Sequence, residues 1–166
     1  MKKYYILLFG LAISFYACKK NTDSTSANGK TTVATNLNND LMLKLVNEKR
    51  ASGCNCGTTA MPPVAALSWN DLLASAALSH SKSMNSNNFF SHTSLNGASA
   101  GDRITAAGYK WTSYGENIAS GQPTEQAVFD AWMNSEGHCK NIMGKNYKEM
   151  GIARDGKYWT QDFGSK

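Results

Sequence analysis

The chain has 166 residues, of which 42% are hydrophobic, and it carries a formal net charge of +5. Removing residues 1–17 takes away two lysines and no acids, so the charge falls to +3 (15 basic minus 12 acidic residues). This surplus is scattered and forms no basic block, which argues against a nucleic-acid partner. Residues 37–166 (166 minus 36, or 130 residues) are enough for one domain with a single core.

The N-terminal segment has the layout of a bacterial secretion signal. Two lysines precede an apolar stretch at residues 6–15, which is too short to cross a bilayer. Ala17 then precedes Cys18, as in lipoprotein signals whose cysteine is acylated after cleavage, although the two residues before Ala17 fit that pattern poorly. We expect residues 1–17 to be a signal peptide and Cys18 to anchor the domain to a membrane outside the cytoplasm. An ordinary signal peptide with a chance cysteine is the alternative.

Residues 18–36 are rich in Asn, Thr and Ser and contain almost no large apolar side chain. Such a segment cannot bury enough surface to offset the entropy lost on ordering. The sequence therefore predicts a lipid-anchored disordered linker here, followed by a folded domain at residues 37–166.

The first helix is expected to begin at residues 38–40, which are good capping residues, and to end by Gly53. Leu41, Leu45 and Val46 recur at helical spacing and predict its buried face. A connection with Pro62 and Pro63 follows, because proline disfavours helix in the preceding residue.

The second helix is predicted to begin at Ser68, with Asp71 three residues later as in a capping box. Its apolar stripe includes His80, which we interpret as a buried structural histidine rather than a ligand. The stripe consists of Leu73, Ala77, His80 and Met84, and residues 85–88 end the helix.

The remaining pattern alternates short helices and strands. A helix at residues 102–107 should end at Gly108, a strand is expected at 113–119, and Thr124 should cap a helix that buries Val128, Ala131 and Trp132. The pair Asp155-Gly156 predicts a type I′ hairpin turn between strands 149–154 and 157–163. The elements together predict an α+β fold.

Seven short motifs follow one another in the order found in the CAP superfamily (cysteine-rich secretory, antigen-five and pathogenesis-related proteins). They lie at residues 46–50, 67–70, 90–92, 108–109, 115–119, 137–138 and 158–161. The chain therefore resembles this superfamily in its bacterial SCP-domain form. The resemblance implies a three-layer α-β-α sandwich.

The resemblance also implies a cleft formed by histidines and acids that can hold a divalent cation such as zinc. Matched by motif, the cleft residues are His92, Glu116 and His138. The family's second acid falls at Ser135, and Glu136 lies one residue further on, where it can point elsewhere. Two imidazoles and one carboxylate can bind zinc with an open position. A purely hydrogen-bonded cluster is the alternative, and no residue can be assigned a catalytic role.

Three cysteines remain once Cys18 is set aside. A bridge between Cys54 and Cys56 would close a very tight ring, so we expect Cys139 to pair with either of them. A zinc site formed by the three cysteines and His138 is a less favoured alternative.

Three functions from different classes follow, one of which is a purely structural role in the cell envelope. The favoured hypothesis is a binding module whose cleft or outer groove holds a lipid, sterol-like molecule, glycan or partner protein. The alternative is a metal-assisted hydrolase acting on peptide or cell-envelope material. The segment of residues 97–101 fits the Gly-x-Ser-x-Gly pattern of hydrolases, but the polar residues before it argue against the required strand.

Overall fold

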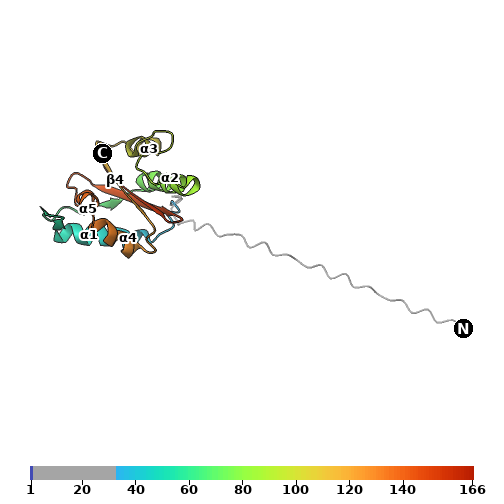
Figure 1. Ribbon diagram of the computed structural model, residues 1–166, viewed down its shortest axis with the longest axis horizontal. Coiled ribbons are helices and arrows are strands. Elements are labelled where there is room, and N and C mark those ends of the chain that lie inside the picture. The colour runs from blue at the N-terminus through green and yellow to red at the C-terminus, as the bar shows by residue number, and fades with distance from the viewer. Residues whose placement is uncertain (2–32) are drawn as a thin grey trace. The chain divides into compact units, whose positions relative to one another are not determined.

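The structure is a computed structural model that describes Met1 and residues 33–166 (Figure 1). Most of the predicted signal peptide, Cys18 and most of the predicted linker lie outside the described residues. The elements in chain order are α1 (Asn39–Ser52), β1 (Cys54–Cys56), β2 (Thr59–Met61), β3 (Ser68–Trp69), α2 (Asp71–Asn87), α3 (Ala100–Ala106), β4 (Ser113–Ser120), α4 (Glu125–Met133), α5 (Glu136–Ile142), β5 (Glu149–Asp155) and β6 (Tyr158–Ser165). Among the described residues, no helix combines the length and apolar character required to span a membrane.

A four-stranded sheet in the order β3-β5-β6-β4 forms the centre, and β1 and β2 form a separate small hairpin. β5 and β6 are antiparallel, as the predicted hairpin requires. Asp155 pairs with Tyr158, so the two loop residues are Gly156 and Lys157 rather than Asp155 and Gly156. Only Gly156 has positive φ there, which excludes the predicted type I′ turn, since that turn needs positive φ at both positions.

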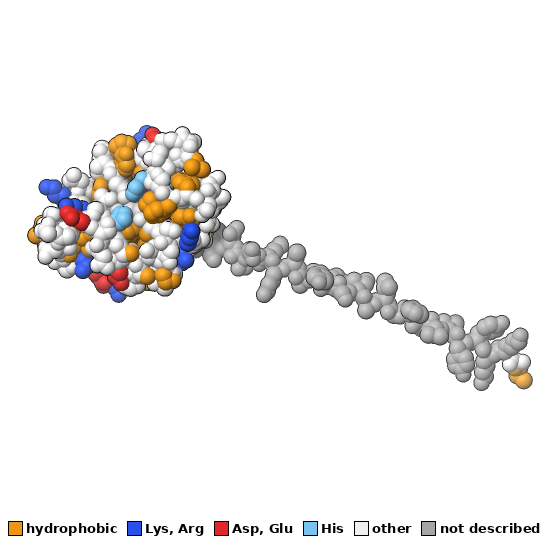
Figure 2. Space-filling view, in the orientation of Figure 1, with side chains coloured by type: hydrophobic (Ala, Val, Ile, Leu, Met, Phe, Trp, Pro, Cys, Tyr) orange, Lys and Arg blue, Asp and Glu red, His pale blue; other side chains and the backbone are white. Residues whose placement is uncertain are grey.

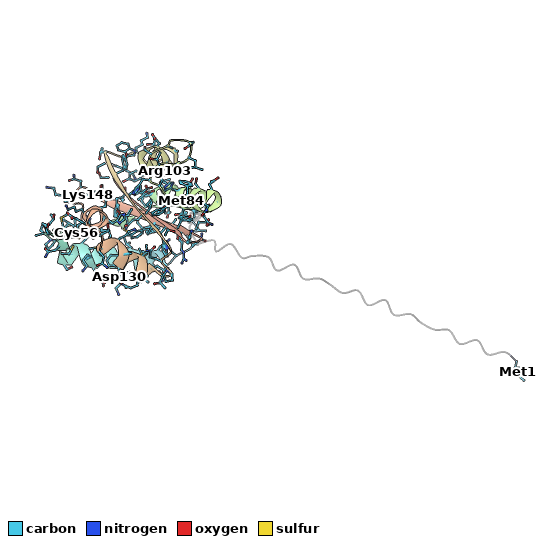
Figure 3. The ribbon with its side chains drawn as sticks, viewed as in Figure 1. Met1, Cys56, Met84, Arg103, Asp130 and Lys148 are labelled. Atoms are coloured by element: carbon cyan, nitrogen blue, oxygen red, sulfur yellow. A yellow bond between two sulfur atoms is a disulfide. The ribbon has the colours of Figure 1, made fainter. Side chains whose placement is uncertain are left out.

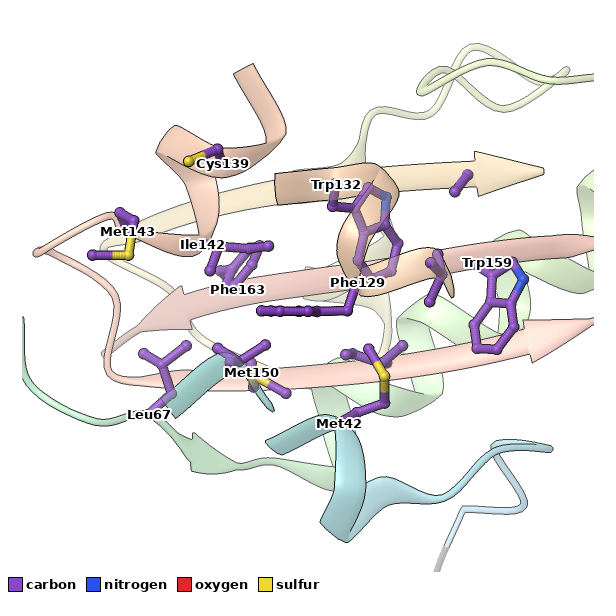
Figure 4. Close-up of a cluster of buried hydrophobic side chains, with 14 of the residues drawn as sticks. Met42, Leu67, Phe129, Trp132, Cys139, Ile142, Met143, Met150, Trp159 and Phe163 are labelled. Atoms are coloured by element: carbon purple, nitrogen blue, oxygen red, sulfur yellow. The ribbon is translucent and has the colours of Figure 1, made fainter. Parts of the chain in front are cut away.

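Helices cover both faces of the sheet, which confirms the α+β fold and the three-layer sandwich. α2 packs on β5 and β6, and α3 lies beside α2. α1, α4 and α5 form the other layer, and Figure 4 shows their side chains meeting those of the sheet around Phe129. Arg103 belongs to the α3 side of the sheet, as Figure 3 shows.

α2 begins two residues later than predicted because Asn70, not Ser68, is its N-cap. The Asn70 side chain accepts hydrogen bonds from the backbone N–H groups of Leu72 and Leu73, and Ser68 lies in β3. The predicted buried face is confirmed. Gly151 of β5 lies so close to the backbone of Ala74 that a Cβ would clash, so this glycine allows α2 to approach the sheet.

The buried face of α1 matches the prediction only in part, since Val46 is buried as expected. Met42, Val46 and Arg50 are buried, whereas Leu41 is 36% exposed. Arg50 is buried because its guanidinium donates to the carbonyl oxygens of Ala65 (2.8 Å), Ile142 (2.6 Å) and Gly144 (3.0 Å). The buried face of α1 therefore includes a charged residue, which a pattern of apolar residues cannot predict.

At the N-terminal edge of the domain, residues of the predicted linker contact the sheet. Thr35 is buried and its carbonyl accepts a hydrogen bond from Arg154 N, while the Asn36 side chain donates to Arg154 O. Ordered contacts thus begin before residue 37.

Candidate functional site

The candidate site is centred on Glu116, in the edge strand β4. Gly115 precedes it, and a Cβ there would clash with the Tyr147 hydroxyl. The Glu116 side chain is only 3% exposed. Its Oε1 lies 2.7 Å from Nδ1 of His92, and its Oε2 lies 2.5 Å from Nη2 of Arg103. Both carboxylate oxygens are therefore already engaged by neighbouring side chains.

Arg103 also fixes the loop that carries His92. Its Nη1 donates to the carbonyl oxygens of His92 (3.0 Å) and Ala98 (3.1 Å) and to the Ser94 hydroxyl (3.0 Å). These bonds fold the loop around one guanidinium, whose planar fork suits several acceptors at once. The position of the His92 imidazole thus depends on Arg103 as well as on Glu116.

Asp162 is a second buried acid beside Glu116. The two residues are directly paired between β4 and β6, so their side chains lie on the same face of the sheet. Asp162 is completely buried, and neither of its carboxyl oxygens has a hydrogen-bond partner among the described residues. Burial, and then the negative charge of Glu116, raise the pKa of Asp162 well above its ordinary value. The protonated form of Asp162 is therefore favoured beside the ion pair of Glu116 and Arg103.

His138 lies at the same edge of the sheet, on α5. Burial and then the charge of His92 lower the pKa of His138, so its neutral form is favoured. The His138 carbonyl accepts a bond from Asn117 Nδ2 (3.2 Å), and Asn141 Nδ2 donates to Asn117 Oδ1 (2.9 Å) and to Glu116 O (3.1 Å). Side-chain amides thus hold α5 against the strand that carries Glu116.

A pocket of about 300 Å³ opens beside His138. Ser135 also lines it, so the predicted cleft positions Ser135 and His138 share one cavity. The other lining residues are mostly apolar: Phe90, Ile118, Ala119, Ser120, Gln122, Ala131 and Trp132. Figure 2 shows hydrophobic side chains next to two histidines on one face of the molecule. The site therefore combines an apolar pocket with a polar border.

The structure brings the predicted cleft residues together only in part. His92 and Glu116 are bonded, and His138 is near enough for the charge of His92 to affect it. Glu136 instead forms an exposed pair with Lys140 one helical turn later (2.5 Å) and is not among the residues that line the pocket.

In this arrangement the donor set does not fit a zinc ion. Both Glu116 oxygens are occupied. Groups of at least three His, Cys, Asp or Glu side chains can hold a metal ion when their ligand atoms lie close together. Among the described residues, only Cys54, Cys56 and Cys139 form such a group, with their ligand atoms all within 4.8 Å of one another. Zinc ligation by His92, Glu116 and His138 therefore stays a prediction, and it requires Glu116 to release one partner.

His80 is buried on α2, as expected for a structural histidine. Its Nε2 lies 2.8 Å from Ser91 O, and burial lowers its pKa. Its neutral imidazole holds the start of the loop that leads to His92.

Ser99, the serine of the rejected hydrolase pattern, caps α3. Its hydroxyl and the Asp102 carboxylate form a reciprocal capping box. The residue therefore has a structural role in the helix.

Cys56 pairs with Cys139, which resolves the two pairings left open by the sequence. Their Cα atoms are 5.5 Å apart, within the usual range for a disulfide. Cys54 is the free cysteine among the described residues.

Sequence reasoning missed Arg103 and Asp162. Their contacts with Glu116 join three segments that are far apart in the chain. One signal was available: only three of the 17 basic residues are arginines, at positions 50, 103 and 154. Each of the three arginines bonds to several backbone or side-chain acceptors, which a lysine would do less well.

Comparison with known proteins agrees with this architecture. The chain is 38% identical over 100 residues to the uncharacterized membrane protein YlbC of Bacillus subtilis (60% of this chain, 29% of that protein). It is 40% identical over 96 residues to the uncharacterized protein YkwD of the same organism (57% of this chain, 37% of that protein). The match thus spans about a third of each curated relative. A crystal structure of an extracellular protein containing an SCP domain from Bacillus anthracis superposes with a TM-score of 0.69 at 31% identity, covering 76% of this chain and 40% of that chain.

The sequence profile of the cysteine-rich secretory protein family matches residues 43–163, which is most of the described domain. The matched region contains the bonded pair His92 and Glu116, His138, and the disulfide between Cys56 and Cys139. The chain belongs to the cysteine-rich secretory protein (CAP) family.

Proposed function

We propose that this protein is a secreted, membrane-tethered CAP domain that binds a small, partly apolar and uncharged ligand beside His138. The observation that carries the proposal is the pocket of about 300 Å³, whose mostly apolar lining is bordered by His138 and Ser135. Ligand pockets in proteins commonly combine apolar walls with a few polar groups that orient the ligand. The volume is at the lower end of that class.

The charges around the pocket favour an uncharged polar end on the ligand. The Glu116 carboxylate is already paired with Arg103, and the neutral form of His138 is favoured. A hydroxyl-rich group can exchange hydrogen bonds with His138 and Ser135 without burying an unpaired charge. Among the ligand classes that the sequence left open, this chemistry favours a lipid-like molecule with a neutral head over an anion.

The relatives support a place outside the cytoplasm. One is described as a membrane protein and another as an extracellular protein. Tethering through Cys18 is our inference from the sequence.

A thermal-shift experiment on the full chain tests the proposal. Octyl glucoside, which has an uncharged sugar head and a short alkyl tail, should raise the melting temperature through binding to the folded state. Ala131→Trp should remove the shift because the new side chain fills the pocket that Ala131 lines. Gln126→Trp, at an exposed position on the same helix, is the matched control and should keep it. A shift that survives Ala131→Trp would place the binding elsewhere and contradict the proposal.

A metal-assisted hydrolase, the alternative that the sequence motifs left open, requires Glu116 to release His92 or Arg103 so that Glu116 can share a zinc ion with His92 and His138. If these histidines bind zinc, the metal should raise the melting temperature, and the effect should weaken below about pH 6 as imidazoles protonate. His92→Ala and His138→Ala should each abolish the response. His80→Ala should lower the stability of the fold without selectively removing the response to zinc. A wild-type melting temperature that zinc leaves unchanged would exclude this candidate.

A further inference from the structure

The three cysteines of the domain lie in one cluster because β1 places two of them on the same side. Side chains two residues apart in a strand point to the same face, so Cys54 and Cys56 both turn toward α5 and Cys139. The three sulfur atoms lie within 4.8 Å of one another.

The free thiol is placed next to the disulfide that it could attack. Cys54 Sγ lies 3.8 Å from Cys139 Sγ, while Cys139 is bonded to Cys56. A disulfide bond is about 2 Å long, so Cys54 Sγ must move about 2 Å closer to Cys139 Sγ to form one. Because all three sulfur atoms lie within 4.8 Å of one another, Cys54 Sγ does not lie in line with the Cys56–Cys139 bond, and the Cys54 side chain must also rotate into line before it attacks. Cys54 is also partly exposed, whereas Cys56 and Cys139 are completely buried. Of the three sulfur atoms, the free one is therefore the one that solvent and external reagents can reach.

We propose that Cys54, Cys56 and Cys139 form a thiol–disulfide exchange site in which Cys139 alternates between two partners. The Cys54 thiolate attacks Cys139 Sγ, the Cys54–Cys139 bond forms, and the Cys56–Cys139 bond breaks. Cys56 leaves as a thiolate and takes up a proton to replace the one that Cys54 released. One disulfide and one thiol are present before and after, so the step needs neither oxidant nor reductant.

The exchange changes which thiol solvent can reach. With Cys56 bonded, the partly exposed Cys54 is free to react with external thiol reagents or disulfides; with Cys54 bonded, the free thiol is at the buried position. Cys139 directly follows His138, so the partner of Cys139 also sets how α5 is attached to β1 beside the pocket. The exchange itself does not depend on the ligand proposed above.

Peptide mapping of the wild-type full chain tests the proposal without any variant. The folded protein is held at about pH 8, quenched in acid, unfolded, tagged with N-ethylmaleimide and digested with pepsin at acid pH without reduction. Fragment ions that break the chain at Asn55 distinguish a tag on Cys54 from one on Cys56. Exchange predicts tags on Cys54 and on Cys56 with Cys139 untagged. Tags on Cys54 alone, or equal tags on Cys56 and Cys139 as simple reduction would give, overturn it.

Two serine variants sharpen the result. Cys54→Ser removes the nucleophile, so the tag on Cys56 should be lost completely. Cys56→Ser should form the Cys54–Cys139 disulfide during purification from an oxidising compartment. A folded Cys56→Ser protein in which Cys54 and Cys139 both take the tag would overturn the proposal. Should that variant fail to fold, the wild-type map decides.

Discussion

Arg103 connects the charge of the site with the shape of its loop. The Arg103 side chain is 9% exposed, and its guanidinium binds the Glu116 carboxylate together with three acceptors in the loop before α3. A charge buried in this way is costly when its partner is removed, since the remaining charge is left without compensation. The site therefore depends on a residue that the family motifs do not mark.

Replacing Arg103 should destabilise the fold strongly. We expect Arg103→Ala to lower the free energy of unfolding by about 3–5 kcal/mol, because Glu116 stays buried without its partner. Arg103→Lys should recover only part of the loss, since one ammonium cannot reproduce the fork of bonds. Urea unfolding measures both variants. Glu136→Ala, which breaks the exposed pair with Lys140, is the control and should lower the free energy of unfolding by no more than about 1 kcal/mol. Equal losses for Arg103→Ala and Glu136→Ala would show that the buried pair of Arg103 and Glu116 contributes no more than an exposed pair.

Asp162 should make stability depend on pH in a direction opposite to that of most carboxylates. The pKa of Asp162 in the folded state is raised above its ordinary value of 3.8. The protonated acid therefore contributes its full stabilisation below about pH 3.8, and this stabilisation is lost as pH rises through the folded-state pKa. Asp162→Asn keeps the shape of the protonated acid and cannot ionise. It should be more stable than wild type at pH 8, by about 1 kcal/mol.

The test of Asp162→Asn is the difference in unfolding free energy between wild type and variant from pH 4 to pH 8. Taking this difference removes the contributions of His80 and His138, which are the same in both proteins. The pKa values of these histidines are lowered in the folded state, so the histidines destabilise the fold as pH falls below 6.5. Asp130→Asn, at an exposed position on α4, should give no such trend. A constant difference between wild type and Asp162→Asn would show that Asp162 titrates normally.

At the scale of elements, the ends of α2 show what sequence could and could not predict. The periodic apolar residues identified the buried face of α2, because packing on the sheet enforces the helical repeat. Both Ser68 and Asn70 are good caps, and local sequence alone could not choose between them. Asn70 caps the helix because β3 takes Ser68 into the sheet, where its backbone pairs with β5.

The same limit applies elsewhere in the fold and site. The hairpin of β5 and β6 was predictable, but its register was shifted by one residue at the turn. Sequence motifs identified the bonded pair His92 and Glu116, since those residues lie in short recognisable segments. The register that sets Asp162 opposite Glu116 is formed between distant strands and has no local signature.

Asn70→Ala should therefore destabilise the protein more than Ser68→Ala. Loss of the cap leaves two N–H groups of α2 without their acceptor and removes the bond to the Glu149 carboxylate (2.8 Å). We expect a cost of about 1–2 kcal/mol, compared with a few tenths for Ser68→Ala. Thermal unfolding of the two variants side by side measures the two losses of stability. Equal losses would contradict the role of Asn70 as the cap of α2.

At the scale of the whole molecule, the expected membrane anchor is the part that lies outside the described residues. Cys18 follows Ala17 directly after the apolar stretch of the predicted signal. Mass spectrometry of the native N-terminus should find a chain that begins at Cys18 and carries at least two acyl chains, because one chain alone anchors weakly. A mature chain that begins at another residue, or at an unmodified Cys18, would rule out the lipid anchor.

The central claim is that the pocket beside His138 binds a partly apolar ligand, and NMR of the tryptophan side chains tests it most directly. Trp132 lines the pocket and donates its indole N–H to Ile118 O (3.3 Å), whereas Trp111 is 40% exposed and bonds within the α3 region. Titration with octyl glucoside should shift the Trp132 indole resonance in a saturable way and leave that of Trp111 unchanged. Ala131→Trp should abolish the Trp132 shift. An unchanged Trp132 resonance, or equal shifts of the two indoles, would contradict binding in this pocket.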